Sequence, residues 1–272
     1  MRSDDQFNSH LQVLDSTFST GDDGIVFASG NTNANKVPSL GLPLSDVVVD
    51  NCTIESKSSA IKFEAIDFGG CDHGPLENMV ISNIVIRNSS RGIGFQQRNG
   101  HGDIRNISFS NLDIQTVYPT GTNWWGSGEP IWITNVGETR AEGARGKLGT
   151  IADISFTGVT AVAENGVLIS GIGRAIGPIT FTNFSLEIAV IGNATCRKGR
   201  PGAPSGCTDY RPGSGPEVVL GNTSGIRVEG VLTFGLDFDP ASNPRASTAF
   251  PGAMPPHPIR MTRSRLPHDE WC

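Results

Sequence analysis

The chain has 272 residues, of which 34 are Gly and 17 are Pro, and its formal net charge is −6. Gly and Pro both destabilise helix interiors, so this composition argues against long helices. No apolar run reaches the ~20 residues that a membrane-spanning helix requires, and the acidic balance excludes the basic surface typical of nucleic-acid binding. We therefore expect a turn-rich, all-β chain with neither a membrane nor a nucleic acid as partner.

Short segments with apolar residues at alternate positions recur along the chain, and such alternation is typical of half-buried strands. They span residues 11–19, 47–55, 79–87, 107–115, 154–162, 179–187 and 226–234. Each contains a central Ser, Asn or Gly, at positions 16, 51, 83, 111, 158, 183 and 230. Two of the gaps between these centres are 47 residues long, which suggests that each holds two units. Further strands are expected at 24–29, 60–65, 92–97, 130–135 and 166–171.

A unit of about 25 to 35 residues with several short strands predicts a parallel β-helix. Asn and Gly suit the bends of such a coil because they tolerate positive φ. A β-sandwich has shorter, hairpin-like spacing, and a propeller has a cleaner ~40-residue period. We expect an all-β, single-stranded parallel β-helix over 1–238. A Pro-rich tail at 239–272, either wrapping or disordered, follows it.

The five cysteines include no CxxC pair, which argues against a structural zinc site, and no metal or other cofactor is predicted. Cys196 and Cys207 flank a Gly/Pro-rich loop and either form a disulfide or stay unpaired. Six sequons fit a secreted glycoprotein, although polar turns also produce such triplets by chance. The sequon asparagines are Asn51, Asn88, Asn106, Asn183, Asn193 and Asn222.

The first candidate for chemistry is an aspartate pair, Asp22 and Asp23, flanked by Gly21 and Gly24 directly after a predicted strand. We expect the bend at Gly21 to turn both carboxylates toward one groove. Close carboxylates raise one another's pKa, so one of them becomes a proton donor near neutral pH. Cleavage of a glycosidic bond needs such an acid together with a base for water. A plain turn and a calcium site are the alternatives.

The segments around this pair and the later coils together resemble glycoside hydrolase family 28, the polygalacturonase-like enzymes. The resemblance rests on residues 21–23, 58–65, 89–112, 123–134 and 207–213, and it covers most of 1–238 in unbroken order. It implies a right-handed parallel β-helix and inverting hydrolysis of galacturonan-type polysaccharides by three aspartates. We accordingly expect a monomer that binds polysaccharide outside the cell or in the cell wall.

By this resemblance Asp22 is the general acid and Asp23 is one of two aspartates that activate water. The third belongs to an upstream Asn-Thr-Asp element that would fall at or before Met1, so we expect the chain to be incomplete at its N-terminus. Within the chain, Asp4 is the candidate for this third role. The first residues do not resemble a signal peptide, which fits the same expectation.

Two departures from the family pattern concern the substrate. Lys57-Ser58-Ser59 stands where the family commonly has Gly-His-Gly, and the family's Arg-x-Lys pair falls on Gly94 and Gln96. Without those charge-assisted donors, either the substrate is less acidic or other bases bind it. Indole rings can stack on sugar faces. The candidates for substrate binding are Lys62, Arg98, Gln96, Trp124, Trp125 and Glu129, with Arg91 as a weaker candidate.

Two other functions remain open. A β-helix that binds polysaccharide without cleaving it would explain the departures from the family pattern. A β-helix lyase would instead use a basic residue and often calcium, and the intact aspartate pair argues against it.

Overall fold

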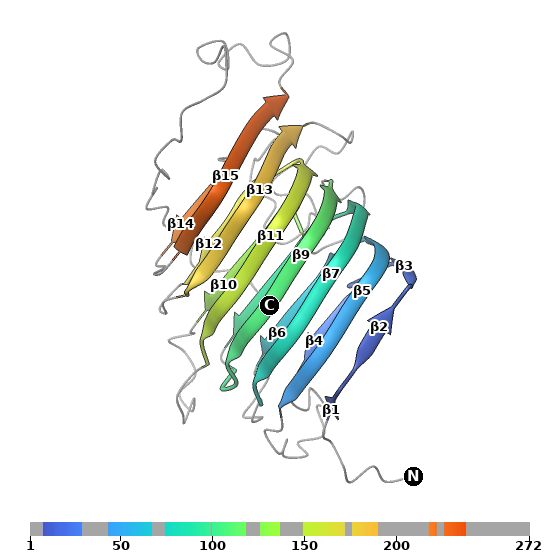
Figure 1. Cartoon of the computed structure of the whole chain (residues 1–272), viewed down its shortest axis with the longest axis vertical. Coiled ribbons are helices and arrows are strands. Elements are labelled where there is room, and N and C mark those ends of the chain that lie inside the picture. The colour runs from blue at the N-terminus through green and yellow to red at the C-terminus, as the bar shows by residue number, and fades with distance from the viewer. Residues whose placement is uncertain are drawn as a thin grey trace, which may run out of the picture.

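The computed structural model describes residues 8–28, 43–66, 74–98, 100–117, 126–136, 149–171, 176–189, 218–221 and 226–237. Every regular element in these ranges is a β-strand, and every strand pair in them is parallel. The chain alternates between two sheets, and successive coils stack along the long axis of the molecule (Figure 1). The predicted parallel β-helix is therefore confirmed.

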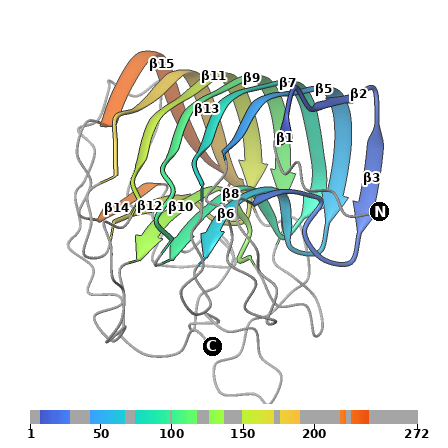
Figure 2. The same ribbon diagram turned by 90° about the horizontal axis from the view of Figure 1, so that it is seen from below.

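One sheet has nine strands, which Figure 2 shows curving around the core. We call it the long-strand sheet. It contains β1 (Asn8–Ser9), β2 (Gln12–Leu14), β3 (Thr17–Thr20), β5 (Leu44–Ser56), β7 (Leu76–Ser89), β9 (Ile104–Thr116), β11 (Ile151–Ala163), β13 (Ile179–Ala189) and β15 (Ile226–Asp237). The other, six-stranded sheet closes the core from the opposite side, and we call it the short-strand sheet. It contains β4 (Ile25–Ala28), β6 (Ser59–Ile66), β8 (Arg91–Arg98), β10 (Glu129–Val136), β12 (Val167–Ser170) and β14 (Val218–Gly221).

The strands lie where the alternation predicts them, but the length of two coils differs from the prediction. Ile104 in β9 pairs directly with Ile151 in β11, and Ile179 in β13 pairs directly with Ile226 in β15. The expectation that each 47-residue gap holds two units is therefore wrong. Each is a single coil, because its two flanking strands are neighbours in the long-strand sheet.

Phenylalanine rings stack along the core in two rows. In the short-strand sheet Phe63 and Phe95 are in register and stacked, with their ring centroids 4.5 Å apart. In the long-strand sheet Phe109, Phe156 and Phe181 stack at centroid distances of 4.7 and 5.1 Å. The rows meet edge to face where Phe63 lies 5.8 Å from Phe109. Each such pair contributes about 0.5–1.5 kcal/mol beyond the burial of its area, so the rows stabilise the stacking of the coils.

Two columns of residues with positive φ bend the long strands. The first column is His10, Asp46, Asn78, Asn106 and Asp153, and the second is Asp15, Asn51, Asn83, Asn111, Gly158 and Asn183. Asn, Asp and Gly adopt this left-handed backbone more readily than other residues. In the first coil both bends interrupt the strand, so β1, β2 and β3 together correspond to one long strand of the later coils. The residue that aligns with the later bends is Asp15, and not Ser16 as predicted.

Side-chain amides connect the second column from coil to coil. The amide of Asn51 donates to Oδ1 of Asp15 at 2.6 Å, and that of Asn111 donates to Oδ1 of Asn83 at 2.7 Å. Asn83 in turn donates to Oδ1 of Asp50, also at 2.7 Å. Asparagine thus serves two purposes at this bend. Its backbone adopts the positive φ that the bend requires, and its side-chain amide forms a hydrogen bond with the next coil.

These columns contain three of the six sequon asparagines. The four sequon asparagines that the structure describes, Asn51, Asn88, Asn106 and Asn183, all have positive φ. Asn51, Asn106 and Asn183 stand in the columns and are followed by alternating strand residues, so there an Asn-X-Ser/Thr triplet arises from the needs of the fold. Asn88 lies near the end of β7 and belongs to neither column. Glycosylation remains a prediction, and the other two sequon asparagines lie outside the described residues.

Replacing Asn83 tests how much the second column of positive-φ residues contributes to the stability of the fold. We expect Asn83→Ala to lower the free energy of unfolding by about 1–3 kcal/mol, because alanine disfavours the left-handed backbone and leaves both amide bonds unmade. Asn83→Gly should lose less, because glycine accepts the backbone and already stands at this bend as Gly158. Urea unfolding measures both variants, and a greater loss for glycine than for alanine would contradict this account.

Candidate functional site

The predicted aspartate pair lies at the bend between β3 and β4, next to the corresponding bend between β5 and β6. The N–H of Gly24 donates to the carbonyl oxygen of Ser59 at 2.9 Å, which ties the two bends together. A Cβ on Gly24 would lie 2.5 Å from the carbonyl oxygen of Ala60, so this close approach requires glycine. Gly21, which we expected to be needed, has no atom within 4 Å of such a Cβ. The bend therefore depends on Gly24.

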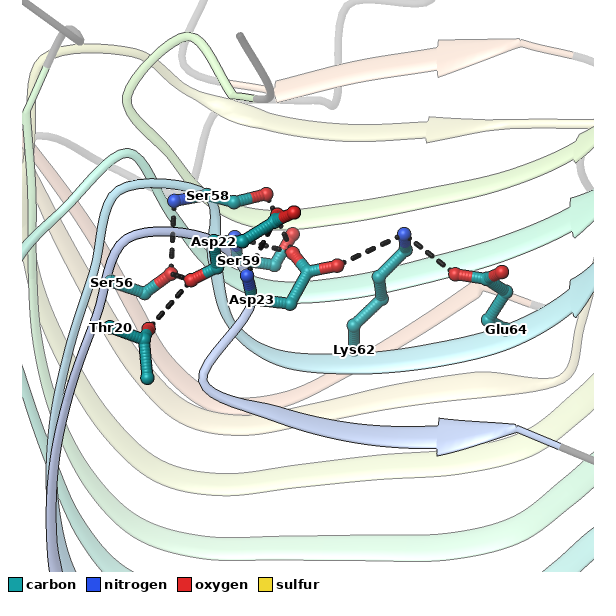
Figure 3. Close-up of polar contacts among 8 residues, drawn as sticks. All are labelled: Thr20, Asp22, Asp23, Ser56, Ser58, Ser59, Lys62 and Glu64. Atoms are coloured by element: carbon teal, nitrogen blue, oxygen red, sulfur yellow. Dashed lines mark hydrogen bonds and ion pairs between the residues drawn. The ribbon is translucent and has the colours of Figure 1, made fainter. Parts of the chain in front are cut away.

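Three donors from the next coil hold the carboxylate of Asp23 (Figure 3). Its Oδ1 accepts hydrogen bonds from Oγ of Ser58 at 2.6 Å and from the N–H of Ser59 at 2.9 Å. Its Oδ2 lies 3.1 Å from Nζ of Lys62, and the Asp23 side chain is 13% exposed. Because a carboxylate has about four lone-pair sites, these contacts leave room for about one further donor.

The pKa of the Asp23 carboxyl follows from this environment. Burial raises the pKa, but the charge of Lys62 and the three hydrogen bonds lower it by more, so it lies below its ordinary value of 3.8. Asp23 is therefore ionised near neutral pH. The expectation that the aspartates mutually raise their pKa values is wrong for Asp23, because a cation and the donors of the neighbouring bend dominate its surroundings.

Lys62 lies between two carboxylates. Its Nζ is 3.1 Å from Oδ2 of Asp23 and 2.6 Å from Oε2 of Glu64, and its side chain is 17% exposed. Burial lowers the pKa of the Lys62 ammonium, whereas the charges of the two carboxylates raise it by more, so its pKa lies above the ordinary value of 10.5. Lys62 is therefore charged and compensated within the protein. Its predicted role in binding substrate is not tested by these contacts.

The carboxylate of Asp22 is exposed, unlike that of Asp23. Its main chain is held firmly, because its carbonyl oxygen accepts hydrogen bonds from Oγ1 of Thr20 at 2.6 Å and from Oγ of Ser56 at 2.8 Å. Its Oδ1 accepts the N–H of Asp23 at 2.9 Å. The backbone of the bend is ordered, and a molecule outside the protein can reach the Asp22 carboxylate that it carries.

Buried hydroxyl groups support the backbone of this bend. Oγ of Ser56 also accepts the N–H of Ser58 at 2.9 Å, and Oγ of Ser89 in the following coil accepts the N–H of Ser56 at 3.0 Å. Ser56 and Ser89 are fully buried, so these bonds satisfy polar groups that water does not reach. We call Ser56, Ser58, Ser59 and Ser89 the serine cluster.

A second charged pair lies on the neighbouring strands. Nε of Arg91, at the start of β8, is 3.5 Å from Oε2 of Glu129, at the start of β10, and both side chains are less than 10% exposed. The guanidinium carbon of Arg91 lies 4.1 Å from the centroid of the Trp132 ring, within the range of a cation–π contact. The N–H of Ser127 also donates to Oε2 of Glu129 at 2.7 Å. The carboxylate of Glu129 therefore has partners inside the protein, and its role in binding substrate stays a prediction.

In the middle of the short-strand sheet, two rows of side chains lie on the face opposite the core. Phe63 and Phe95 point into the core, and neighbouring strand residues point to the opposite face. The outward rows are Lys62, Gly94 and Trp132, followed by Glu64, Gln96 and Thr134. We call these six residues, together with Ser59, Arg91 and Glu129, the outer face. Asp22 and Asp23 lie at its edge, and the predicted Gln96 is part of it.

Several predicted residues cannot be placed with the site. Asp4, Trp124, Trp125, Cys196 and Cys207 lie outside the described residues, as does the tail at 239–272. Of Arg98 only the strand position at the end of β8 is described. Among the described residues the cysteine is Cys52, a free and buried thiol in the core.

The partners of Asp23 were not predicted from the sequence. Ser58 and Ser59, which depart from the family pattern, are the donors that hold the carboxylate. Glu64 was not considered, yet it stands two residues after Lys62 in a strand and therefore on the same face. Aligning the ends of the long strands would have shown a hydroxyl residue in successive coils, such as Thr20 against Ser56.

Within the described ranges, no three His, Cys, Asp or Glu side chains gather in a way that could hold a metal ion. The same part of the chain has no helix long and apolar enough to span a membrane. Compared with protein-family models and with curated proteins, the chain gives no match.

Replacing Asp23 tests the bend. We expect Asp23→Asn to lower the free energy of unfolding at pH 7 by about 2 kcal/mol, because hydrogen bonds to a charged group are lost. Since the pKa of Asp23 in the folded protein lies below 3.8, its stabilisation is present above that pH and is lost as the pH falls through the folded pKa. The difference between wild type and variant should therefore shrink in acid. Urea unfolding from pH 7 to pH 3 measures it, and an unchanged difference at the lowest pH would contradict the assignment.

Proposed function

We propose that the chain is a glycoside hydrolase, similar to the polygalacturonase-like enzymes, that cleaves a cell-wall polysaccharide with inversion. The observation that carries the proposal is the contrast within the aspartate pair. Asp22 presents an exposed carboxylate on an ordered bend, and the adjacent Asp23 is ionised and held by the next coil. Two neighbouring carboxyl groups in different environments are what acid–base cleavage of a glycosidic bond requires.

The proposed mechanism assigns one proton transfer to each side of the scissile bond. Asp22 donates a proton to the leaving glycosidic oxygen, because its carboxyl group is the one that a bound polysaccharide can reach. A base on the opposite side removes a proton from water as the water attacks the anomeric carbon. An inverting enzyme separates the acid and the base by roughly 6.5–9.5 Å to admit that water.

Asp23 is a candidate for the base that removes the proton from water. It is ionised, and its three donors leave room for about one further donor, such as a water molecule. Asp4 is the further aspartate that we propose to share this role, and it lies outside the described residues. No cofactor enters the scheme.

A second function, the binding of polysaccharide without cleavage, is favoured by the same contacts. A carboxylate with a lowered pKa and three donors is a weak general base. If Asp23 only holds the bend, then the outer face binds sugar and no water is activated.

Replacing Asp22 decides between the two functions. We expect Asp22→Asn to lower the release of reducing ends from pectic and related polysaccharides by on the order of 10²–10⁴-fold, the usual contribution of a general acid. Binding of the same polysaccharides should persist, because the amide keeps the size of the carboxyl group.

The matched control is Asp46→Asn. Asp46 is an exposed aspartate at a bend of the long-strand sheet, in the column that also holds Asn78 and Asn106. The control should retain full activity. Equal activity of Asp22→Asn and wild type would refute the role of Asp22, and binding without hydrolysis by the wild type would favour the second function.

A further inference from the structure

Lys62 lies closer to one of its two carboxylates than to the other (Figure 3). Its Nζ is 2.6 Å from Oε2 of Glu64 and 3.1 Å from Oδ2 of Asp23. The three side chains are 13% to 17% exposed, so solvent screens their charges less than it would on an open surface. Glu64 therefore makes the closer contact with the ammonium group, and Asp23 makes the longer one.

The strand positions beside these charges are occupied by uncharged residues. β6 lies between β4 and β8, so Lys62 and Glu64 each have a paired residue on both sides. These neighbours are Val26 and Gly94 beside Lys62, and Ala28 and Gln96 beside Glu64. The paired positions therefore add no charge to either residue.

The other charged groups around the bend have partners of their own or carry no charge in the reactive form. Lys57 is exposed and contacts Glu55. On the next two strands the charges of Arg91 and Glu129 oppose each other. Asp22 adjoins Asp23, and in the proposed mechanism it holds the proton for the leaving oxygen. Among the described contacts, the charges of the strands reach Asp23 through Lys62 and its second partner.

An ammonium group that contacts two carboxylates favours the ionised form of each less than it would favour a single one, because the second carboxylate repels the first. Without the charge of Glu64, the ammonium of Lys62 would act on Asp23 alone and would make Asp23 a weaker base. General bases are most effective when their affinity for a proton suits the working pH. The closer contact of Glu64 therefore opposes the loss of basicity that the donors of Asp23 cause.

We propose that Glu64 is a positioning residue of the proposed hydrolysis. By holding the ammonium of Lys62 at the shorter distance, it limits the positive charge that acts on Asp23 and keeps Asp23 able to take a proton from water. As the water oxygen bonds to the anomeric carbon, Asp23 gains that proton and Asp22 gives one to the leaving oxygen, so the protons balance. Glu64 touches neither substrate nor water. This inference rests on the proposed function and specifies how its base is regulated.

The dependence of stability on pH tests the inference without an assay of activity. The stabilisation by the Asp23 carboxylate is lost as the pH falls through its pKa in the folded protein. Urea unfolding of Asp23→Asn against its parent measures that loss in the wild-type, Glu64→Gln and Lys62→Met backgrounds. We expect Glu64→Gln to move the loss to lower pH by about one unit, because the ammonium then acts on Asp23 alone. Lys62→Met should move it to higher pH, because the ammonium is gone.

Hydrolysis provides the second measurement. We expect Glu64→Gln to move the acid limb of kcat/KM for the release of reducing ends to lower pH by about one unit. The rate on the plateau should fall by about threefold, because Asp23 is then a weaker base. The control is Glu77→Gln, which removes the same charge beside Arg105 on the long-strand sheet and should leave the pH profile and the stability difference of Asp23→Asn unchanged.

The outcomes separate this inference from the proposed function. If the wild type hydrolyses polysaccharide while Glu64→Gln leaves both pH dependences where they were, the inference is overturned and the proposed function stands. A move to higher pH in Glu64→Gln would overturn it as well, and this variant decides the matter even where Lys62→Met does not fold. If the wild type hydrolyses no polysaccharide, the proposed function fails and the inference fails with it.

Discussion

The in-register stacking of one coil on the next is the constraint on which the rest of this structure depends. Parallel hydrogen bonding places each residue beside the same position of the neighbouring coil, so side chains of one kind can form continuous rows. Phenylalanines gain from this arrangement by stacking, and asparagines gain by donating to the next amide. Charged residues do not gain, because like charges would stand side by side. Opposite charges therefore meet across the coils, as Lys62 meets Asp23 and Arg105 meets Glu77.

The candidate site follows from the same constraint. The bend that carries Asp23 is completed by Ser58 and Ser59 of the following coil, and the serine cluster continues to Ser89 one coil further. No single coil contains the site, and its geometry depends on the stacking of three successive bends. A change in the register of one coil would remove the donors of Asp23 before it affected the exposed carboxylate of Asp22.

The period and the alternation were sufficient to predict the parallel β-helix and the positions of its strands, because inward residues repeat at every second position. They were not sufficient to predict the length of the coils. The 47-residue coils show that connecting segments vary freely while paired strands such as β9 and β11 stay adjacent. The aspartate pair was visible as a motif, but its electrostatics were not. The pKa of Asp23 depends on Lys62, which is distant in sequence and reaches the bend only through stacking.

The two adjacent aspartates therefore acquire different properties from the coils around them and not from their own sequence context. Charged strand residues of the outer face have partners on the same strand, as Lys62 has in Glu64, or on the neighbouring coil, as Arg91 has in Glu129. A bend residue can stay exposed and outside this pairing. Asp22 is exposed, while its backbone carbonyl is held by Thr20 and Ser56. In a solenoid of this kind, exposed carboxylates are consequently expected at the bends and paired charges on the strands between them.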